Sequence, residues 1–121
     1  MTDRISILVV EDEAIVLMDV ADQLEAEGFR VYTAFNADVA IELMIAHIDI
    51  RLVFTDIDMP GTMNGLKLVE AVRKRWPPVK LIVTSGHHVV NIAGLPKGSV
   101  FISKPYLHSA VLGSMNSLLA A

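Results

Sequence analysis

Residues 52–61 read LVFTDIDMPG, a short apolar run that is followed at once by two acidic residues, Asp56 and Asp58. The run is apolar at consecutive positions and rich in β-branched residues, which is typical of a strand buried on both faces of a parallel sheet. Three further runs have the same character, at residues 5–10, 81–84 and 100–103. A weaker run at residues 29–34 suits an edge strand, so the chain is expected to form five strands.

Helical stretches alternate with these runs. They are expected at residues 14–27, from the capping residue Asn36 onward, at residues 65–75 and at residues 107–120. The first helix is expected to bury one face, which holds Leu17, Met18, Ala21 and Leu24. Residues 86–98 leave room only for a short, poorly defined helix near residues 89–93. This alternation predicts an α/β fold, doubly wound, with a parallel sheet and helices on both of its faces.

Length and composition favour one cytoplasmic domain. Residues 1–121 are interpreted as a single domain without an output domain. The absence of cysteine excludes a disulfide framework and a thiolate metal site. The net charge of -4 disfavours direct binding to nucleic acid. No apolar run approaches the roughly 18 residues of a membrane span, and the N-terminus does not resemble a signal peptide, so we expect no membrane insertion.

Polar residues that could carry chemistry follow four of the five expected strands. In a doubly wound sheet the ligand site lies beyond the carboxyl ends of the strands, where the strand order reverses. The residues found at these ends are Glu11 and Asp12 after the first strand, Asp56 and Asp58 after the third, Thr84 and Ser85 at the fourth, and Lys104 after the fifth. We therefore expect these side chains to meet at one edge of the sheet.

A cluster of carboxylates at this edge favours a magnesium site. Asp12 and Asp56 would lie close together with Glu11 nearby, and like charges are costly at short range unless a cation neutralises them. Oxygen ligands without cysteine or histidine point to Mg²⁺, which completes its shell with water and phosphate oxygens. Lys104 and a hydroxyl at Ser85 or Thr84 could then meet phosphoryl oxygens.

Each of these residues also has an ordinary structural interpretation. Acids that follow a strand often cap the next helix, which applies to Asp12 and Glu13. Asp58 precedes Met-Pro-Gly and could serve turn formation alone. A lysine near a strand end is usually a solvated surface group. The functional interpretation is favoured because unrelated surface residues should not all fall at strand ends.

With these residues in this order and spacing, the sequence resembles the receiver domain of two-component response regulators over its whole length. The matching pieces are the acid pair after the first strand, the segment TDIDMPGTMNG, the hydroxyl pair at the fourth strand and the pair Lys104 and Pro105. The resemblance implies a flavodoxin-like sheet with strand order 2-1-3-4-5. It also implies a stand-alone signalling domain, similar to single-domain chemotaxis regulators, that catalyses only its own phosphorylation and dephosphorylation.

The resemblance assigns a role to each residue of the cluster. Asp56 would be the phosphoacceptor, with a sensor histidine kinase or a histidine phosphotransfer protein as donor. Asp12 and Asp56 would bind Mg²⁺ through their side chains and Asp58 through its backbone carbonyl, with Glu11 contributing directly or through water. Lys104 would pair with the phosphoryl group, and the bond between Lys104 and Pro105 would be cis.

The resemblance also implies a conformational switch that signals to a downstream protein, whose identity the motifs do not encode. Ser85 fits the family's switch hydroxyl better than Thr84, because Gly86 follows it. Phe101 occupies the position of the switch aromatic residue. The segment MPGTMNG is one residue longer than usual, and residues 85–101 form a shorter segment than usual.

Three other functions fit parts of the sequence. The Asp-x-Asp pair at Asp56 and Asp58 also occurs in haloacid-dehalogenase-like phosphatases, but there it follows the first strand. A flavodoxin is disfavoured, because the loop after the first strand presents acids where a flavin phosphate would need hydroxyl and amide groups. A pseudo-receiver that works without phosphorylation is disfavoured by the intact Asp12, Asp56 and Lys104.

Overall fold

The computed structural model describes residues 4–59, 64–86 and 95–120 of the chain. Five parallel strands form one sheet in the order β2-β1-β3-β4-β5, which confirms the predicted flavodoxin-like order. The strands are β1 (Ser6–Val10), β2 (Arg30–Ala34), β3 (Ile50–Asp56), β4 (Lys80–Ser85) and β5 (Val100–Ser103). The three inner strands are therefore β1, β3 and β4, and their carboxyl ends define the middle of the sheet edge.

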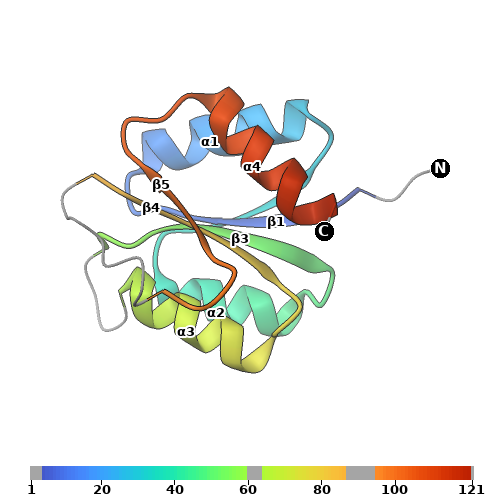
Figure 1. Ribbon diagram of the computed structural model, residues 1–121, viewed down its shortest axis with the longest axis vertical. Coiled ribbons are helices and arrows are strands. Elements are labelled where there is room, and N and C mark those ends of the chain that lie inside the picture. Colours follow the sequence, from blue (N-terminus) through green and yellow to red (C-terminus); the bar gives the residue numbers. More distant parts are fainter. Residues whose placement is uncertain (1–3, 60–63, 87–94, 121) are drawn as a thin grey trace.

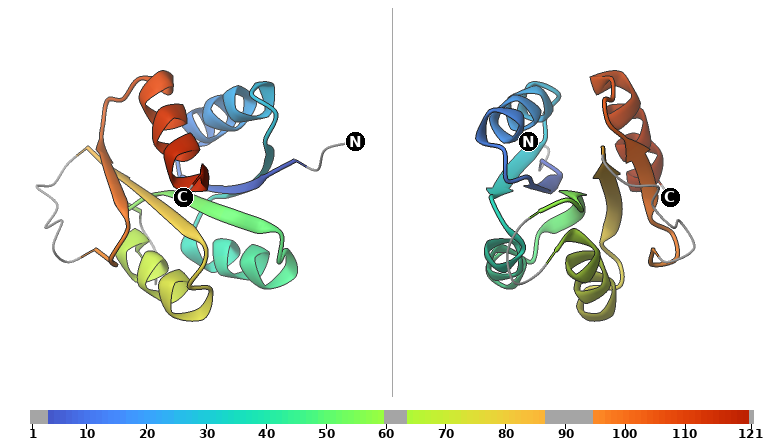
Figure 2. Two further views of the ribbon diagram at one scale, coloured as in Figure 1. Left: turned by 45° about the vertical axis from the view of Figure 1, so that its right-hand side comes forward. Right: turned by 90° about the vertical axis from the view of Figure 1, so that its left-hand side faces the viewer.

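Helices cover both faces of the sheet, as predicted. They are α1 (Ala14–Ala26), α2 (Ala37–Ala46), α3 (Gly65–Arg75) and α4 (His108–Ala120). Figure 1 shows α1 and α4 above the sheet and α2 and α3 below it, and the turned views of Figure 2 keep this three-layer arrangement. Each face of the sheet has its own apolar core, one beneath each helix pair. The short helix expected near residues 89–93 lies outside the described residues.

Side chains at the helix starts explain why two of these helices begin where they do. Asn36 accepts a hydrogen bond from the backbone N–H of Val39 at 2.8 Å, as its predicted role as N-cap requires. Asn64 accepts one from the N–H of Lys67 at 3.0 Å and caps α3 in the same way. Within the described part of the chain, no helix has the length and apolar character to cross a membrane.

Two predictions about burial are wrong. Met18 was expected on the buried face of α1, but its side chain is 65% exposed, and α1 instead buries Leu17, Val20, Ala21 and Leu24. Strand β5 was expected to be buried on both faces, yet its residues are half-buried or exposed. The reason is its place in the sheet, since β5 is the last strand and pairs with β4 alone.

Candidate functional site

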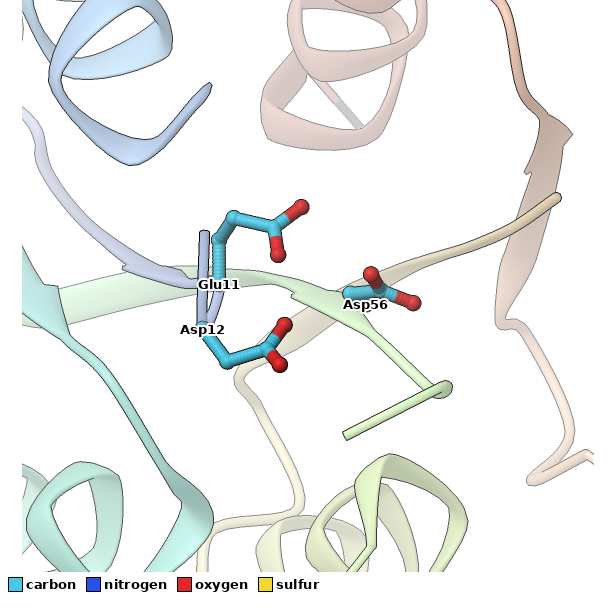
Figure 3. A group of neighbouring side chains, drawn as sticks. All are labelled: Glu11, Asp12 and Asp56. Carbon is cyan, nitrogen blue, oxygen red and sulfur yellow. The ribbon is translucent and has the colours of Figure 1, made fainter. Parts of the chain in front are cut away.

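Three carboxylates meet at the carboxyl edge of the sheet. Glu11 and Asp12 follow β1 and Asp56 ends β3, and one ligand oxygen from each residue lies within 4.8 Å of the others. Figure 3 shows the three carboxyl groups pointing into a shared space. Glu11 and Asp56 are each only 4% exposed, whereas Asp12 is exposed to solvent. The cluster therefore combines two buried acids with one that solvent can reach.

Lys104 lies against the two buried acids. Its Nζ donates a hydrogen bond to Oδ2 of Asp56 at 2.6 Å and one to Oε1 of Glu11 at 3.0 Å. Burial acts to lower the pKa of Lys104, but the hydrogen bonds to Asp56 and Glu11 outweigh it and hold the pKa above its ordinary value. The lysine is therefore a fixed positive charge that balances only part of the negative charge of the cluster.

Burial makes the negative charge that Lys104 leaves unbalanced unfavourable. Burial raises the pKa of Glu11 above its ordinary value, although hydrogen bonds from the Glu13 N–H, at 3.1 Å, and from Lys104 act in the opposite direction. The cluster offers three carboxylate oxygens close enough to bind one ion, and one of the three residues is exposed to water. Such a site suits a hard divalent cation that keeps part of its water shell. These residues fit Mg²⁺.

Asp58 contacts both the third strand and the fourth. Its backbone N–H donates to Oδ1 of Asp56 at 2.8 Å, so both oxygens of the Asp56 carboxylate are engaged. Its own carboxylate Oδ2 accepts a hydrogen bond from Oγ of Ser85 at 2.7 Å and one from the N–H of Gly86 at 3.3 Å. The sequence pointed to turn formation or a backbone ligand at Asp58 and did not indicate this side-chain contact.

The two candidate hydroxyls differ in their surroundings. Both Ser85 and Thr84 are almost fully buried. Oγ1 of Thr84 finds no hydrogen-bond partner in residues 4–59, 64–86 and 95–120, whereas Ser85 donates to Asp58. Alternate residues of a strand face the same side of a sheet, so Ser85 lies on the side of Val83.

Phe101 lies on that same side. It is the register partner of Val83 across β4 and β5, and both residues belong to the same apolar core. Its side chain is half-buried. The predicted switch residues Ser85 and Phe101 are therefore neighbours on one face of the sheet, and Thr84 lies on the other face.

The cluster opens into a cavity of about 760 Å³. Asp12, Asp56, Asp58 and Lys104 line the part next to the cluster, and residues of α1, of α4 and of the segment between β5 and α4 line most of the rest. The bond between Lys104 and Pro105 is cis. A ligand that enters this cavity can reach the Asp56 carboxylate from solvent.

Comparison with known proteins gives the family. A family profile described as "Response regulator receiver domain" matches residues 7–113. The chain belongs to this family. Receiver domains are signalling domains that are phosphorylated by histidine kinases and generally bind Mg²⁺ at an acidic pocket.

Individual relatives agree with this assignment. The nitrogen assimilation regulatory protein NtrX of Azorhizobium caulinodans is 35% identical over 104 residues, which are 83% of this chain and 23% of NtrX. The aerobic respiration control protein ArcA of Escherichia coli is 33% identical over 102 residues, 83% of this chain and 42% of ArcA. The receiver domain thus spans less than half the length of these relatives.

A solved structure matches nearly the whole domain. The response regulator receiver protein of Sinorhizobium medicae superposes with a TM-score of 0.90 at 29% identity, covering 98% of this chain and 97% of that one. The flavodoxin-like receiver fold predicted from the sequence is confirmed by this match and by the strand order.

Proposed function

We propose that this receiver domain accepts a phosphoryl group on Asp56 from a sensor histidine kinase or a histidine phosphotransfer protein. The observation that carries the proposal is the placement of Asp56 at the base of an open cavity, in contact with the Lys104 ammonium and beside Glu11 and Asp12. In this role the domain acts in the cytoplasm, where ATP supplies the phosphoryl group of histidine kinases. The output is a conformational signal to a downstream protein.

The chemistry is a transfer between two nucleophiles. A carboxylate oxygen of Asp56 attacks the phosphorus of phosphohistidine, the O–P bond forms as the N–P bond breaks, and the imidazole nitrogen leaves with the electron pair. Mg²⁺ held by the carboxylate cluster would neutralise negative charge on the phosphoryl oxygens. Hydrolysis of the acyl phosphate later restores the Asp56 carboxylate.

The protein's own groups prepare Asp56 for this reaction. Lys104 neutralises charge near the reacting oxygens, and the Asp58 N–H fixes the orientation of the carboxylate. Asp12 and Asp56 would hold Mg²⁺ through their side chains and Asp58 through its backbone carbonyl, with Glu11 acting directly or through water.

The switch is proposed to run through Ser85 and Phe101. A phosphoryl group on Asp56 offers new acceptor oxygens, towards which the Ser85 hydroxyl can turn. The movement changes the space beside Phe101. Ser85 and Val83 lie on the same face of β4, and Val83 packs in the same apolar core as Phe101. Thr84 is the less favoured hydroxyl, because its side chain lies on the face of the sheet opposite to Phe101.

Phosphorylation with and without magnesium tests the function. We expect acetyl phosphate, or a phosphorylated histidine kinase, to label the protein in the presence of Mg²⁺ and to leave it unlabelled in the presence of EDTA. Hydroxylamine should remove the label, since an acyl phosphate is cleaved by this nucleophile, and peptide mapping should place it on Asp56. Equal labelling in EDTA, or a label on another residue, would contradict the proposal.

Magnesium titration separates Asp12 from its exposed neighbour Glu13. Asp12 belongs to the carboxylate cluster, whereas Glu13 contributes only its backbone N–H to Glu11. We expect Asp12→Asn to weaken Mg²⁺ binding about tenfold or more, because loss of even an outer partner of a metal site costs that much. Glu13→Gln should change the affinity little. Calorimetric titration measures both, and equal effects of the two variants would remove Asp12 from the metal site.

A further inference from the structure

The Ser85 hydroxyl is already engaged in the structure, and its partner is not the phosphoacceptor. Its proton is donated to Oδ2 of Asp58 at 2.7 Å, and the Gly86 N–H donates to the same oxygen at 3.3 Å. Ser85 is 2% exposed, and Asp58 is half-buried. A short hydrogen bond from a buried hydroxyl to a carboxylate is stronger than one between neutral groups. It therefore holds the hydroxyl in one orientation.

This bond competes with the movement on which the switch depends. A serine hydroxyl has a single proton, so Ser85 cannot donate to a phosphoryl oxygen and to Asp58 at the same time. We propose that the Asp58 carboxylate is a positioning residue that latches Ser85 in the unphosphorylated arrangement, so that activation requires the bond between them to break. This inference rests on the proposed phosphorylation of Asp56.

Asp58 is placed to respond to phosphorylation as well as to hold Ser85. Its backbone N–H donates to Oδ1 of Asp56 at 2.8 Å, so one residue contacts both the phosphoacceptor and the switch hydroxyl. A phosphoryl group on Asp56 adds negative charge to the cavity that Asp58 also lines, and like charges repel. Phosphorylation thus disfavours the latched arrangement while it offers Ser85 a new acceptor.

If Asp58 holds Ser85 in this way, loss of its carboxylate should raise the affinity for a ligand that imitates the phosphoryl group. Consider a ligand that binds only molecules in which the bond between Asp58 and Ser85 is broken. Its apparent Kd equals the intrinsic Kd divided by the fraction of such molecules. Beryllofluoride with Mg²⁺ imitates the phosphoryl group on an aspartate. Because a hydrogen bond to a charged group shifts an equilibrium by roughly tenfold or more, we expect Asp58→Ala to bind beryllofluoride about tenfold more tightly than the wild type.

Loss of a negative charge alone would also tighten binding, so the test is a double-mutant cycle with Ser85→Ala. If Asp58 acts through the Ser85 hydroxyl, Asp58→Ala strengthens beryllofluoride binding more in the Ser85 background than in the Ser85→Ala background, where only the effect of the lost charge remains. Glu13→Gln is the charge control, since Glu13 also lines the cavity, and its effect should be small and equal in both backgrounds. Thermal unfolding checks that each variant is folded.

A second measurement needs no ligand. In the ligand-free protein, Asp58→Ala should move the amide resonance of Phe101 towards its position in the beryllofluoride-bound wild type, and should not do so when Ser85 is alanine. Equal tightening in the two backgrounds, or an unmoved Phe101 resonance, would overturn the latch. Failure of the wild type to bind beryllofluoride would instead contradict the proposed function. A shift of the ligand-free Phe101 resonance by Asp58→Ala that is absent in the Ser85→Ala background would then still show that Asp58 acts through Ser85.

Discussion

Asp56→Asn is expected to take up no phosphoryl group from acetyl phosphate or from a phosphorylated histidine kinase, while its fold is retained. An amide has nearly the shape of the carboxylate but no anionic oxygen that can attack phosphorus. Lys104 keeps its hydrogen bond to Glu11 when Asp56 is neutral, so its ammonium is not left without a partner. Intact-protein mass spectrometry before and after incubation measures the uptake.

Asp49→Asn is the matched control for this experiment. Asp49 precedes β3 at the end of the strand opposite to Asp56, where it accepts hydrogen bonds from Ser6 and, at 3.2 Å, from Tyr32. This variant makes the same chemical change far from the carboxylate cluster, so it should be labelled as fully as the wild type. Full labelling of Asp56→Asn, or loss of labelling in Asp49→Asn, would contradict the assignment of Asp56 as phosphoacceptor.

The sequence predicts the layers of this fold well because they depend on local patterns. The continuous apolar run that leads to Asp56 requires cover on both faces, and the two prolines after Arg75 end α3 at that residue, as predicted. Exposure depends on neighbours that are distant in the chain. Met18 and strand β5 follow apolar patterns, yet both are open to solvent. Met18 lies beside the stripe of α1 that packs on the sheet, and β5 is the last strand of the sheet.

The functional site likewise has features that the sequence predicts and features that it does not. Convergence of the acids and Lys104 could be predicted, because parallel strands deliver their carboxyl ends to one edge. The resemblance favours Ser85 over Thr84 because Gly86 follows it. The structure adds that Ser85 shares a face of the sheet with Phe101, since adjacent strand residues point to opposite faces. The contact between Asp58 and Ser85 depends on the turn after β3, which no local pattern encodes.

Gly65 is the position where a single methyl group should disturb both the fold and the site. This buried glycine is the first residue of α3, and a Cβ atom there would overlap the carbonyl oxygen of Asp56 and the Cα of Ile57. Both obstacles belong to the backbone, so no side-chain rotation can relieve the overlap. Either the first turn of α3 or the end of β3 must move. We expect Gly65→Ala to lower the free energy of unfolding by about 3 kcal/mol, the upper end of what overpacking usually costs.

The same displacement should slow phosphorylation of Asp56 by on the order of 100-fold, since a shift of about 1 Å in a reacting group can have that effect. Gly113→Ala is the control, because a Cβ atom at this position in α4 meets nothing within 4 Å. It should raise the free energy of unfolding by about 0.8 kcal/mol, the helix preference of alanine over glycine, and leave labelling unchanged. Urea unfolding and the time course of labelling measure the two effects. If Gly65→Ala were as stable as the wild type and labelled at the same rate, α3 would not be held against the end of β3 as closely as the structure has it.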